Sequence, residues 1–270
     1  MQFRTFSIEV DRGVATVVLR GTGGGNAMGG LVWTELPAVV AALDADEAVR
    51  AVVLRGAGEC FSTGLDLRWY LPHYRRLTRH PDTLPARLLT EATAMQEAIS
   101  AVAGSGLPWI AAVHGDCVGA GLDLVSACDI RLAAADASFS LREIRIGIVA
   151  DLGSLQRLPH IVGAAATREF ALTGRDISAG EALARGLVTR VLPDLDALVE
   201  DATGVAARIA AYAPATVAGV KSVLDRTRDM SVAEGLRHVA LWNAAFLPHP
   251  ALPDLLASAL RSSTNGGTDD

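Results

Sequence analysis

The alternation of short apolar runs with a glycine turn and a helical pattern across residues 109–141 constrains the fold more than any other feature. Trp109–Val113 has the composition of a buried strand, and the glycine turn after it leads into a helical pattern from Gly121. Two strand-like runs follow, Asp129–Ala133 and Phe139–Leu141. Strands that alternate with a helix in this way favour an α/β protein with parallel strand pairing.

The flanking segments extend this pattern in both directions. A hairpin of Phe3–Val10 and Val14–Arg20 is expected, because a turn containing Gly13 separates two apolar runs. Further elements are expected as helices over 31–43 and 87–102 and strands over 51–54 and 188–192. After Pro214 the patterns are helical only, over 215–229, 232–246 and 253–260. We therefore predict a core over residues 1–200 and a helical C-terminal region over residues 201–270, with the boundary placed loosely between residues 195 and 213.

The segment Pro72–Pro85 interrupts this regularity. It is rich in arginine and histidine and shows no clear period. One interpretation is a solvated insertion, and the other is a lid or a contact for ligand phosphates. The sequence alone leaves both open.

Composition narrows the classes of function. A formal charge of −6 argues against general attraction to nucleic acid or to an anionic membrane, and no apolar run reaches the roughly 18 residues of a membrane helix. Cys60, Cys117 and Cys128 have neither metal-site nor disulfide spacing, so we expect no metal and a cytoplasmic setting. The start of the chain does not resemble a signal peptide. A full dinucleotide fingerprint, a nucleophile elbow, a P-loop and an HExxH motif are all missing from the sequence.

Two glycine-containing turns carry the first chemical signal. In Phe61–Leu65 and Val118–Leu122, small residues stand where backbone N–H groups could remain free at the start of a helix. Two such groups facing one point form an oxyanion hole, in which each donor is worth roughly 3 kcal/mol. Ordinary tight turns are the alternative for either segment.

Three acids supply the second signal. Each has an ordinary explanation: Asp123 as a cap in the first helical turn, Glu143 as a surface partner of Arg142 or Arg145, and Asp151 as a helix N-cap. All three, however, lie beside apolar or glycine-rich segments, where burial raises carboxyl pKa values and favours proton transfer. Together they suggest acid–base catalysis beside an oxyanion hole.

At this point the sequence resembles a known family. The resemblance rests on four segments: RGAGECFSTGLDL at Arg55–Leu67, the long run from Ala112 to Pro159, TGRDISAGEALARGLVTRVLP at Thr173–Pro193, and NAM at Asn26. They resemble the enoyl-CoA hydratase/isomerase (crotonase) superfamily over residues 3–260. The resemblance implies a spiral of ββα units followed by a helical region that forms homotrimers or homohexamers. It also implies an acyl-CoA thioester substrate from fatty-acid β-oxidation, with coenzyme A as part of the substrate and no separate cofactor.

Positions carry over from the family residue by residue. The backbone N–H donors of the oxyanion hole fall on Leu65 and on Ala120, where the family usually has glycine but only the N–H is needed. The side chains and backbone that the resemblance places against the substrate are those of Ser62, Gly64, Asp66 and Gly119.

The acids separate the subfamilies. The set Asp123, Glu143 and Asp151 resembles that of the Δ3,5-Δ2,4-dienoyl-CoA isomerases, which implies conversion of 3,5-dienoyl-CoA into 2,4-dienoyl-CoA. By this resemblance Asp151 acts at C2, Glu143 acts at C6 and Asp123 orients them; the reverse order of the first two stays open. A 2-enoyl-CoA hydratase is the main alternative, although Asp123 is one methylene shorter than the hydratase glutamate. A non-catalytic acyl-CoA-binding protein is the second alternative.

Overall fold

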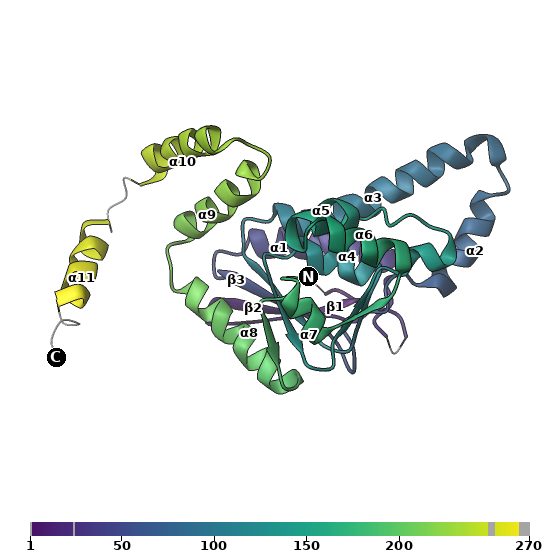
Figure 1. Ribbon diagram of the computed structural model, residues 1–270, viewed down its shortest axis with the longest axis horizontal. Coiled ribbons are helices and arrows are strands. Elements are labelled where there is room, and N and C mark those ends of the chain that lie inside the picture. Colours follow the sequence, from purple (N-terminus) through teal and green to yellow (C-terminus); the bar gives the residue numbers. More distant parts are fainter. Residues whose placement is uncertain (1, 24, 248–251, 265–270) are drawn as a thin grey trace. The chain divides into compact units, whose positions relative to one another are not determined.

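The computed structural model describes residues 2–23, 25–247 and 252–264 (Figure 1). The chain forms two compact units, Met1–Ala211 and Tyr212–Asp270, each described here by itself. The division lies later than the expected boundary at residue 200, which falls inside α8 (Leu195–Ala210). The reason is packing, since Leu198 and Ala202 of α8 are fully buried against the sheet of the first unit.

The first unit is built on a mostly parallel sheet. Within the described residues, six strands follow the order β1-β2-β3-β4-β6-β9, with β1 and β2 antiparallel and every other neighbouring pair parallel. A smaller sheet has the order β5-β7-β8. The expected hairpin and the expected parallel pairing are confirmed. The strands are β1 (Phe6–Asp11), β2 (Val14–Leu19), β3 (Ala51–Gly56), β4 (Trp109–Val113), β5 (Asp116–Val118), β6 (Ile130–Ala134), β7 (Ser138–Ser140), β8 (Asp176–Ser178) and β9 (Arg190–Leu192).

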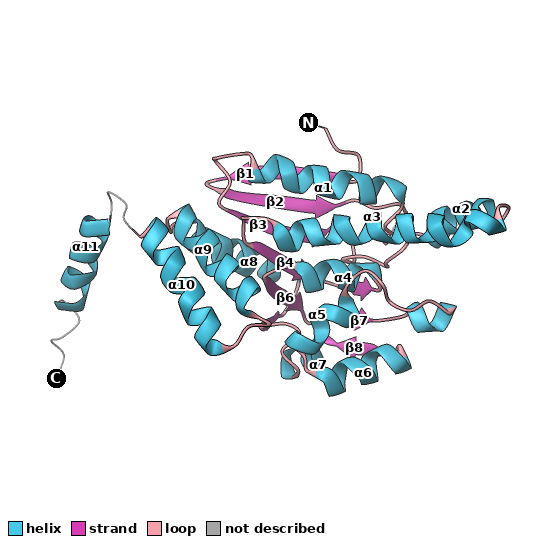
Figure 2. Cartoon of the chain, turned by 90° about the horizontal axis from the view of Figure 1, so that it is seen from above, coloured by secondary structure: helices cyan, strands magenta, loops and turns pink. Residues whose placement is uncertain are grey.

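Helices cover both faces of the large sheet. Strand residues alternate between faces, so Val52 and Leu54 of β3 join one core cluster while Ala51 and Val53 join the other with α8. Figure 2 shows α1 and α3 lying along one face of the sheet. Besides α8, the helices of this unit are α1 (Gly30–Asp44), α2 (Leu67–Leu77), α3 (Leu84–Gly104), α4 (Ala120–Ala127), α5 (Ser154–Ile161), α6 (Ala164–Thr173) and α7 (Ala179–Ala184).

The segment expected to be irregular at 72–85 is mostly helical, and that prediction was wrong. Helix α2 (Leu67–Leu77) contains Pro72, and the short 3₁₀ helix η1 (Pro81–Thr83) follows. Asp66 caps α2 by accepting hydrogen bonds from two backbone N–H groups of the first turn. Because this cap starts the helix upstream of the proline, Pro72 removes only one hydrogen bond from a helix that is already nucleated.

The second unit consists of helices in its described part, as the sequence predicts. They are α9 (Pro214–Thr227), α10 (Val232–Phe246) and α11 (Leu252–Thr264). A capping box formed by Ser231 and Glu234 starts α10. Helices α9 and α10 approach closely, because a Cβ at Gly219 would lie 2.4 Å from the indole nitrogen of Trp242. None of the described helices has the length and apolar character that crossing a membrane requires.

Candidate active site

Backbone pairing brings the two glycine-containing turns together. Ser62 forms a parallel bridge with Cys117, and the Val118 N–H donates to the Ser62 carbonyl at 2.9 Å. Gly64 has φ +87°, and a Cβ placed on it would lie 2.6 Å from the Val118 oxygen and 3.5 Å from the Ala120 nitrogen. Only glycine fits this approach and this backbone conformation. The residue after Gly64 therefore lies close to the start of α4.

The two predicted oxyanion donors have free N–H groups. The amides of Leu65 and Ala120 find no hydrogen-bond acceptor within the described ranges. The adjacent backbone amides, in contrast, are hydrogen-bonded: the Gly119 N–H donates to the Ser140 carbonyl at 2.8 Å, and the Asp66 N–H donates to the Met28 carbonyl at 3.1 Å. A pair of free amides at a helix start can hold a developing oxyanion.

Asp123 lies on α4, one turn beyond the Ala120 donor, and is 1% exposed. Its Oδ1 accepts a hydrogen bond from the Ser154 backbone N–H at 2.6 Å and another from the Ser154 hydroxyl. Burial raises the pKa of Asp123 to about 6, although the Ser154 hydrogen bonds and the charge of Arg157 oppose the rise. Sequence reasoning missed Ser154, whose one signal is a small hydroxyl residue at the first position of a helix.

Glu143 lies in the 3₁₀ helix η2 (Glu143–Ile146) and points toward the glycine turn. A Cβ at Gly119 would lie 2.7 Å from Glu143 Oε1, so the carboxylate fills the space that glycine leaves open. The alternative interpretation of Glu143 as a partner in a surface ion pair was wrong, because Arg142 and Arg145 pair instead with Asp176, at 2.9 and 3.8 Å. Their charges are thus directed away from the site.

The carboxylate of Glu143 is only partly satisfied. Its Oε2 is buried and has no hydrogen-bond partner in the part of the chain that is described. Burial, followed by the negative charges of Asp123 and Asp151, raises the pKa of Glu143 to about 7. Since the charges of Asp123 and Asp151 act on Glu143, and that of Asp151 acts on Asp123, the three acids lie within electrostatic reach of one another.

Asp151 completes the set without acting as a helix cap. The N-cap of α5 is Gly153, which makes no side-chain capping bond, so the capping interpretation was wrong. The Asp151 carbonyl accepts a hydrogen bond from Gln96 Nε2 of α3 at 2.7 Å. Its carboxylate reaches solvent at the edge of the site, and partial burial raises its pKa.

The predicted substrate contacts Ser62 and Asp66 use their side chains inside the protein. The Ser62 hydroxyl donates to the Asn26 carbonyl at 2.9 Å and accepts from the Gly64 N–H at 3.1 Å. It therefore shapes the turn that carries the oxyanion donor. Its contact with substrate stays a prediction, as does that of Asp66.

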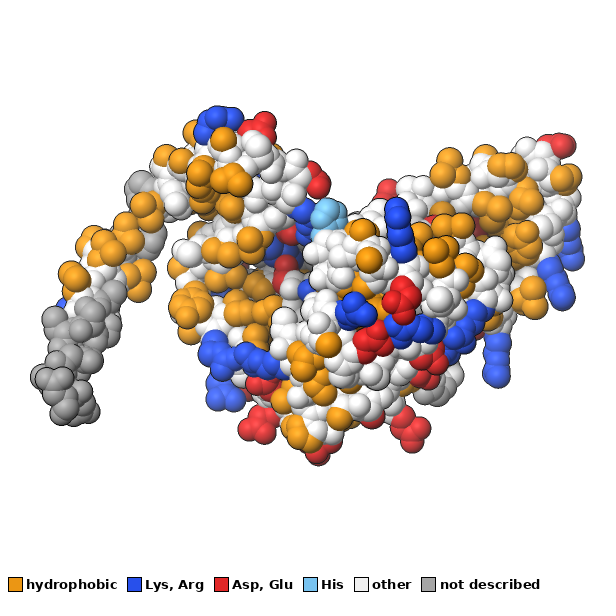
Figure 3. Space-filling model, viewed as in Figure 1, with side chains coloured by type: hydrophobic (Ala, Val, Ile, Leu, Met, Phe, Trp, Pro, Cys, Tyr) orange, Lys and Arg blue, Asp and Glu red, His pale blue; other side chains and the backbone are white. Residues whose placement is uncertain are grey.

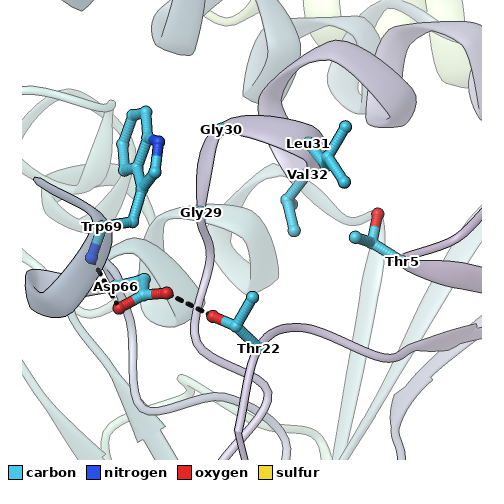
Figure 4. Close-up of a pocket in the computed structure, with 8 residues that line it drawn as sticks. All are labelled: Thr5, Thr22, Gly29, Gly30, Leu31, Val32, Asp66 and Trp69. Carbon is cyan, nitrogen blue, oxygen red and sulfur yellow. Dashed lines mark hydrogen bonds between the residues drawn. The ribbon is translucent and has the colours of Figure 1, made fainter. Parts of the chain in front are cut away.

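Asp66 connects α2 to the glycine-rich loop. Oδ1 accepts from the N–H groups of Arg68 at 2.9 Å and Trp69 at 3.1 Å, and the Thr22 hydroxyl donates to Oδ2. The Thr22 hydrogen bond is the main cause that lowers the pKa of Asp66. Figure 4 shows this arrangement beside a pocket of about 370 Å³. The pocket is lined by Thr5, Thr22, Gly29, Gly30, Leu31, Val32, Asp66 and Trp69.

Comparison with known proteins gives the family. Residues 9–240 match the family model described as enoyl-CoA hydratase/isomerase. The chain belongs to this family. It is 41% identical to the peroxisomal Δ3,5-Δ2,4-dienoyl-CoA isomerase of Arabidopsis thaliana over 224 residues, which cover 82% of this chain and 81% of the relative.

Two further similarities agree with this membership. The mitochondrial Δ3,5-Δ2,4-dienoyl-CoA isomerase of Homo sapiens is 38% identical over 259 residues, covering 89% of this chain and 73% of that protein. The crystal structure of a putative enoyl-CoA hydratase from Streptomyces coelicolor A3(2) superimposes with a TM-score of 0.88 at 29% identity, covering 97% and 93% of the two chains. The expected crotonase-type α/β fold is confirmed, and the chain is an enzyme of this family.

The site combines two free backbone amides with acids whose pKa values are raised by burial. With a pKa of about 6, Asp123 is mostly ionised at neutral pH, while Glu143, at about 7, is close to half protonated. Acids and bases transfer protons best when their pKa values lie near the working pH. The arrangement can therefore remove one proton and deliver another beside a bound carbonyl.

Proposed function

We propose that the protein isomerises 3,5-dienoyl-CoA to 2,4-dienoyl-CoA. The observation that carries the proposal is the convergence of Asp123, Glu143 and Asp151, whose pKa values are all raised, beside the free amides of Leu65 and Ala120. Relatives at about 40% identity bear the name of this isomerase. A hydratase needs two acids around one water, and the third acid is what favours the isomerase.

The reaction moves one proton and leaves the composition of the substrate unchanged. A carboxylate removes a proton from C2, and the negative charge spreads through a dienolate to the thioester oxygen. The N–H groups of Leu65 and Ala120 hold that oxygen, where each donor is worth roughly 3 kcal/mol. Delivery of a proton to C6 then shifts the double bonds from C3 and C5 to C2 and C4.

Two acids divide the proton transfers. We assign Asp151 to C2 and Glu143 to C6, while buried Asp123 holds the loop before α5 through Ser154. Deuterium at C2 of the substrate tests the order. If the assignment holds, Asp151→Asn stops loss of the label, whereas Glu143→Gln permits exchange with solvent and blocks formation of the product.

An ultraviolet assay tests the function itself. Purified protein is mixed with a 3,5-dienoyl-CoA while absorption of the conjugated 2,4-dienoyl thioester is followed, and a 2-enoyl-CoA is run beside it. A rise with the first substrate supports isomerisation. A product heavier by one water from the second, with no reaction of the first, would identify a hydratase, and binding without turnover would identify a non-catalytic member.

The C-terminal helices support a further proposal, that the protein assembles as a homotrimer or homohexamer. Apolar side chains on α9 and α10 are exposed, among them Leu224, Leu236 and Leu241. Figure 3 shows hydrophobic side chains on this surface. Large exposed apolar surfaces commonly mark protein interfaces. Sedimentation equilibrium gives the mass directly, and a monomer at micromolar concentration would contradict the proposal.

We also propose that the protein acts in the cytoplasm and needs no cofactor beyond the coenzyme A of its substrate. The cysteine pattern of the sequence supports the first part, while the two isomerase relatives are named peroxisomal and mitochondrial. Cell fractionation tests the location. Activity after gel filtration in the presence of a chelator tests the need for a cofactor or metal.

A further inference from the structure

Helix α5 begins inside the protein without a side-chain cap. Its first residue, Ser154, is fully buried, and the N-cap Gly153 has φ +122° and no side chain that could accept a hydrogen bond. The first N–H groups of a helix have no partner within the helix itself. The N–H of Ser154 therefore needs an acceptor from another part of the chain.

Asp123 of α4 is that acceptor. Its Oδ1 accepts the Ser154 backbone N–H at 2.6 Å and the Ser154 hydroxyl as well. Oδ2 accepts no hydrogen bond from the residues that the structure describes. Two donors on one oxygen fix the rotation of the carboxylate, and hydrogen bonds to a carboxylate favour its ionised form.

The other two acids of the site lack such support. Glu143 Oε2 is buried without a partner among the described residues, and the Asp151 carboxylate accepts no hydrogen bond from another segment of the described chain. Burial, followed by the charge of Asp123, raises the pKa of Glu143 to about 7. Ser154 thus bonds the one acid whose charge acts directly on Glu143.

The titratable groups around Asp123 come from several elements. The positive charge of Arg157 on α5 favours ionisation of Asp123, whereas the negative charges of Asp151 and of Glu143 on η2 oppose it. Cys117 of β5 stays a neutral thiol, because burial raises its pKa well above the ordinary value. Removing one serine hydroxyl alters none of these groups. The buried residues of α3 are apolar, namely Ala98, Ile99 and Val102.

We propose that Ser154 is a positioning residue whose hydroxyl and backbone N–H hold Oδ1 of Asp123, so that Asp123 stays ionised as a fixed negative charge beside Glu143. This inference rests on the proposed isomerisation, in which Glu143 delivers the proton to C6. Ser154 acts only through Asp123.

Three variants separate the hydrogen bond from packing. Ser154→Ala removes the hydroxyl and keeps the backbone N–H. Ser154→Cys fills the same space with a thiol, which is a much weaker donor. Ser126→Ala is the matched control: Ser126 is also a buried serine, on α4, but its hydroxyl donates to the Asp123 backbone carbonyl at 2.7 Å and not to the carboxylate.

The first measurement needs no reaction. Nuclear magnetic resonance of ¹³C-aspartate-labelled protein follows the titration of the Asp123 carboxyl, with Asp123→Asn assigning the signal. The midpoint should move upward by about one pH unit in both Ser154→Ala and Ser154→Cys and stay at the wild-type value in Ser126→Ala. An unchanged midpoint in Ser154→Ala, or a change that Ser154→Cys does not share, contradicts the proposal.

The second measurement is the pH profile of kcat/KM with a 3,5-dienoyl-CoA. Ser154→Ala should lose about tenfold at pH 5 and change little at pH 8, because Asp123 is ionised at pH 8 in both proteins. An equal loss at the two pH values would overturn the proposal in favour of a purely structural role. If the wild-type protein does not isomerise this substrate, the proposed function fails, while the titration of Asp123 still decides what Ser154 does.

Discussion

The acids beside the two turns of the proposed oxyanion hole, Asp66 and Glu143, are in opposite states. On the side of Leu65, the Asp66 carboxylate accepts three hydrogen bonds and its pKa is lowered. On the side of Ala120, Glu143 has a buried oxygen without a partner in the described structure, and its pKa is raised to about 7. The difference teaches that a fully bonded acid holds the scaffold, whereas an incompletely bonded one is available for proton transfer.

The largest expected effect comes from neutralising the incompletely bonded acids. Glu143→Gln and Asp151→Asn should each lower kcat by about 10²–10⁴-fold, the usual contribution of general acid–base catalysis. Steady-state kinetics with a 3,5-dienoyl-CoA measure this loss. Asp201 lies on α8 and forms an exposed ion pair with Arg190 of β9, so Asp201→Asn is the matched control for loss of a negative charge. Near-normal turnover in both catalytic variants would remove the distinction between the two turns.

A second prediction concerns the contact between the turns. Gly64→Ala would place a Cβ 2.6 Å from the Val118 oxygen and push the Leu65 and Ala120 amides apart. Since loss of one oxyanion donor costs about 10²–10³-fold in kcat, a fall of this size is expected. Gly58→Ala serves as control, because Gly58 also has a positive φ, +68°, but open space around its Cβ position. Equal losses in the two variants would trace the effect to backbone strain instead of the oxyanion hole.

The third prediction uses pH to measure the cost of burying Asp123. The pKa of Asp123 is about 6 in the folded protein, against an ordinary value of 3.8. The carboxyl therefore stays protonated to higher pH in the folded state than in the unfolded state. The contribution of Asp123 to stability should therefore fall by about 3 kcal/mol as pH rises from 4 to 6 and stay lower above pH 6.

Asp123→Asn removes this titration and keeps an oxygen that can accept from Ser154. Urea unfolding at pH 4 and pH 8 should show the variant gaining stability relative to wild type only at the higher pH. An equal difference between variant and wild type at the two pH values would mean that Asp123 has an ordinary pKa.

The smallest expected effect lies on the fully bonded side. Asp66→Ala removes the N-cap of α2 and should reduce the free energy of unfolding by about 1 kcal/mol. Asp66→Asn, which can still cap the helix, should lose much less. Thermal unfolding measures both. A rise in KM in both variants, including Asp66→Asn with its nearly unchanged stability, would show that Asp66 also contacts the substrate.

Local patterns in the sequence predicted much of the architecture. Short apolar runs identified β2 and β3, because these strands are buried on both faces. The helical spacing of Leu36, Val39 and Leu43 identified α1, because that helix buries one face. The helix around Pro72 was missed, since its cap at Asp66 lies upstream of a proline that dominates the local signal. The boundary could be placed only loosely, between residues 195 and 213, because packing of α8 on the sheet leaves no mark on composition.

For the candidate site, the sequence by itself determined which residue types stand beside glycine turns and helix starts. It therefore indicated the two turns and the acids Asp123, Glu143 and Asp151, while the resemblance to the family pointed to Leu65 and Ala120 as the donors. Only the tertiary structure decided the state of each acid. Ser154 donates a hydrogen bond to Asp123 from 31 positions away along the chain. The arginines next to Glu143 form ion pairs with Asp176 and not with Glu143. A carboxyl pKa depends on desolvation and on charges brought close by folding, and neither can be read from neighbours along the chain.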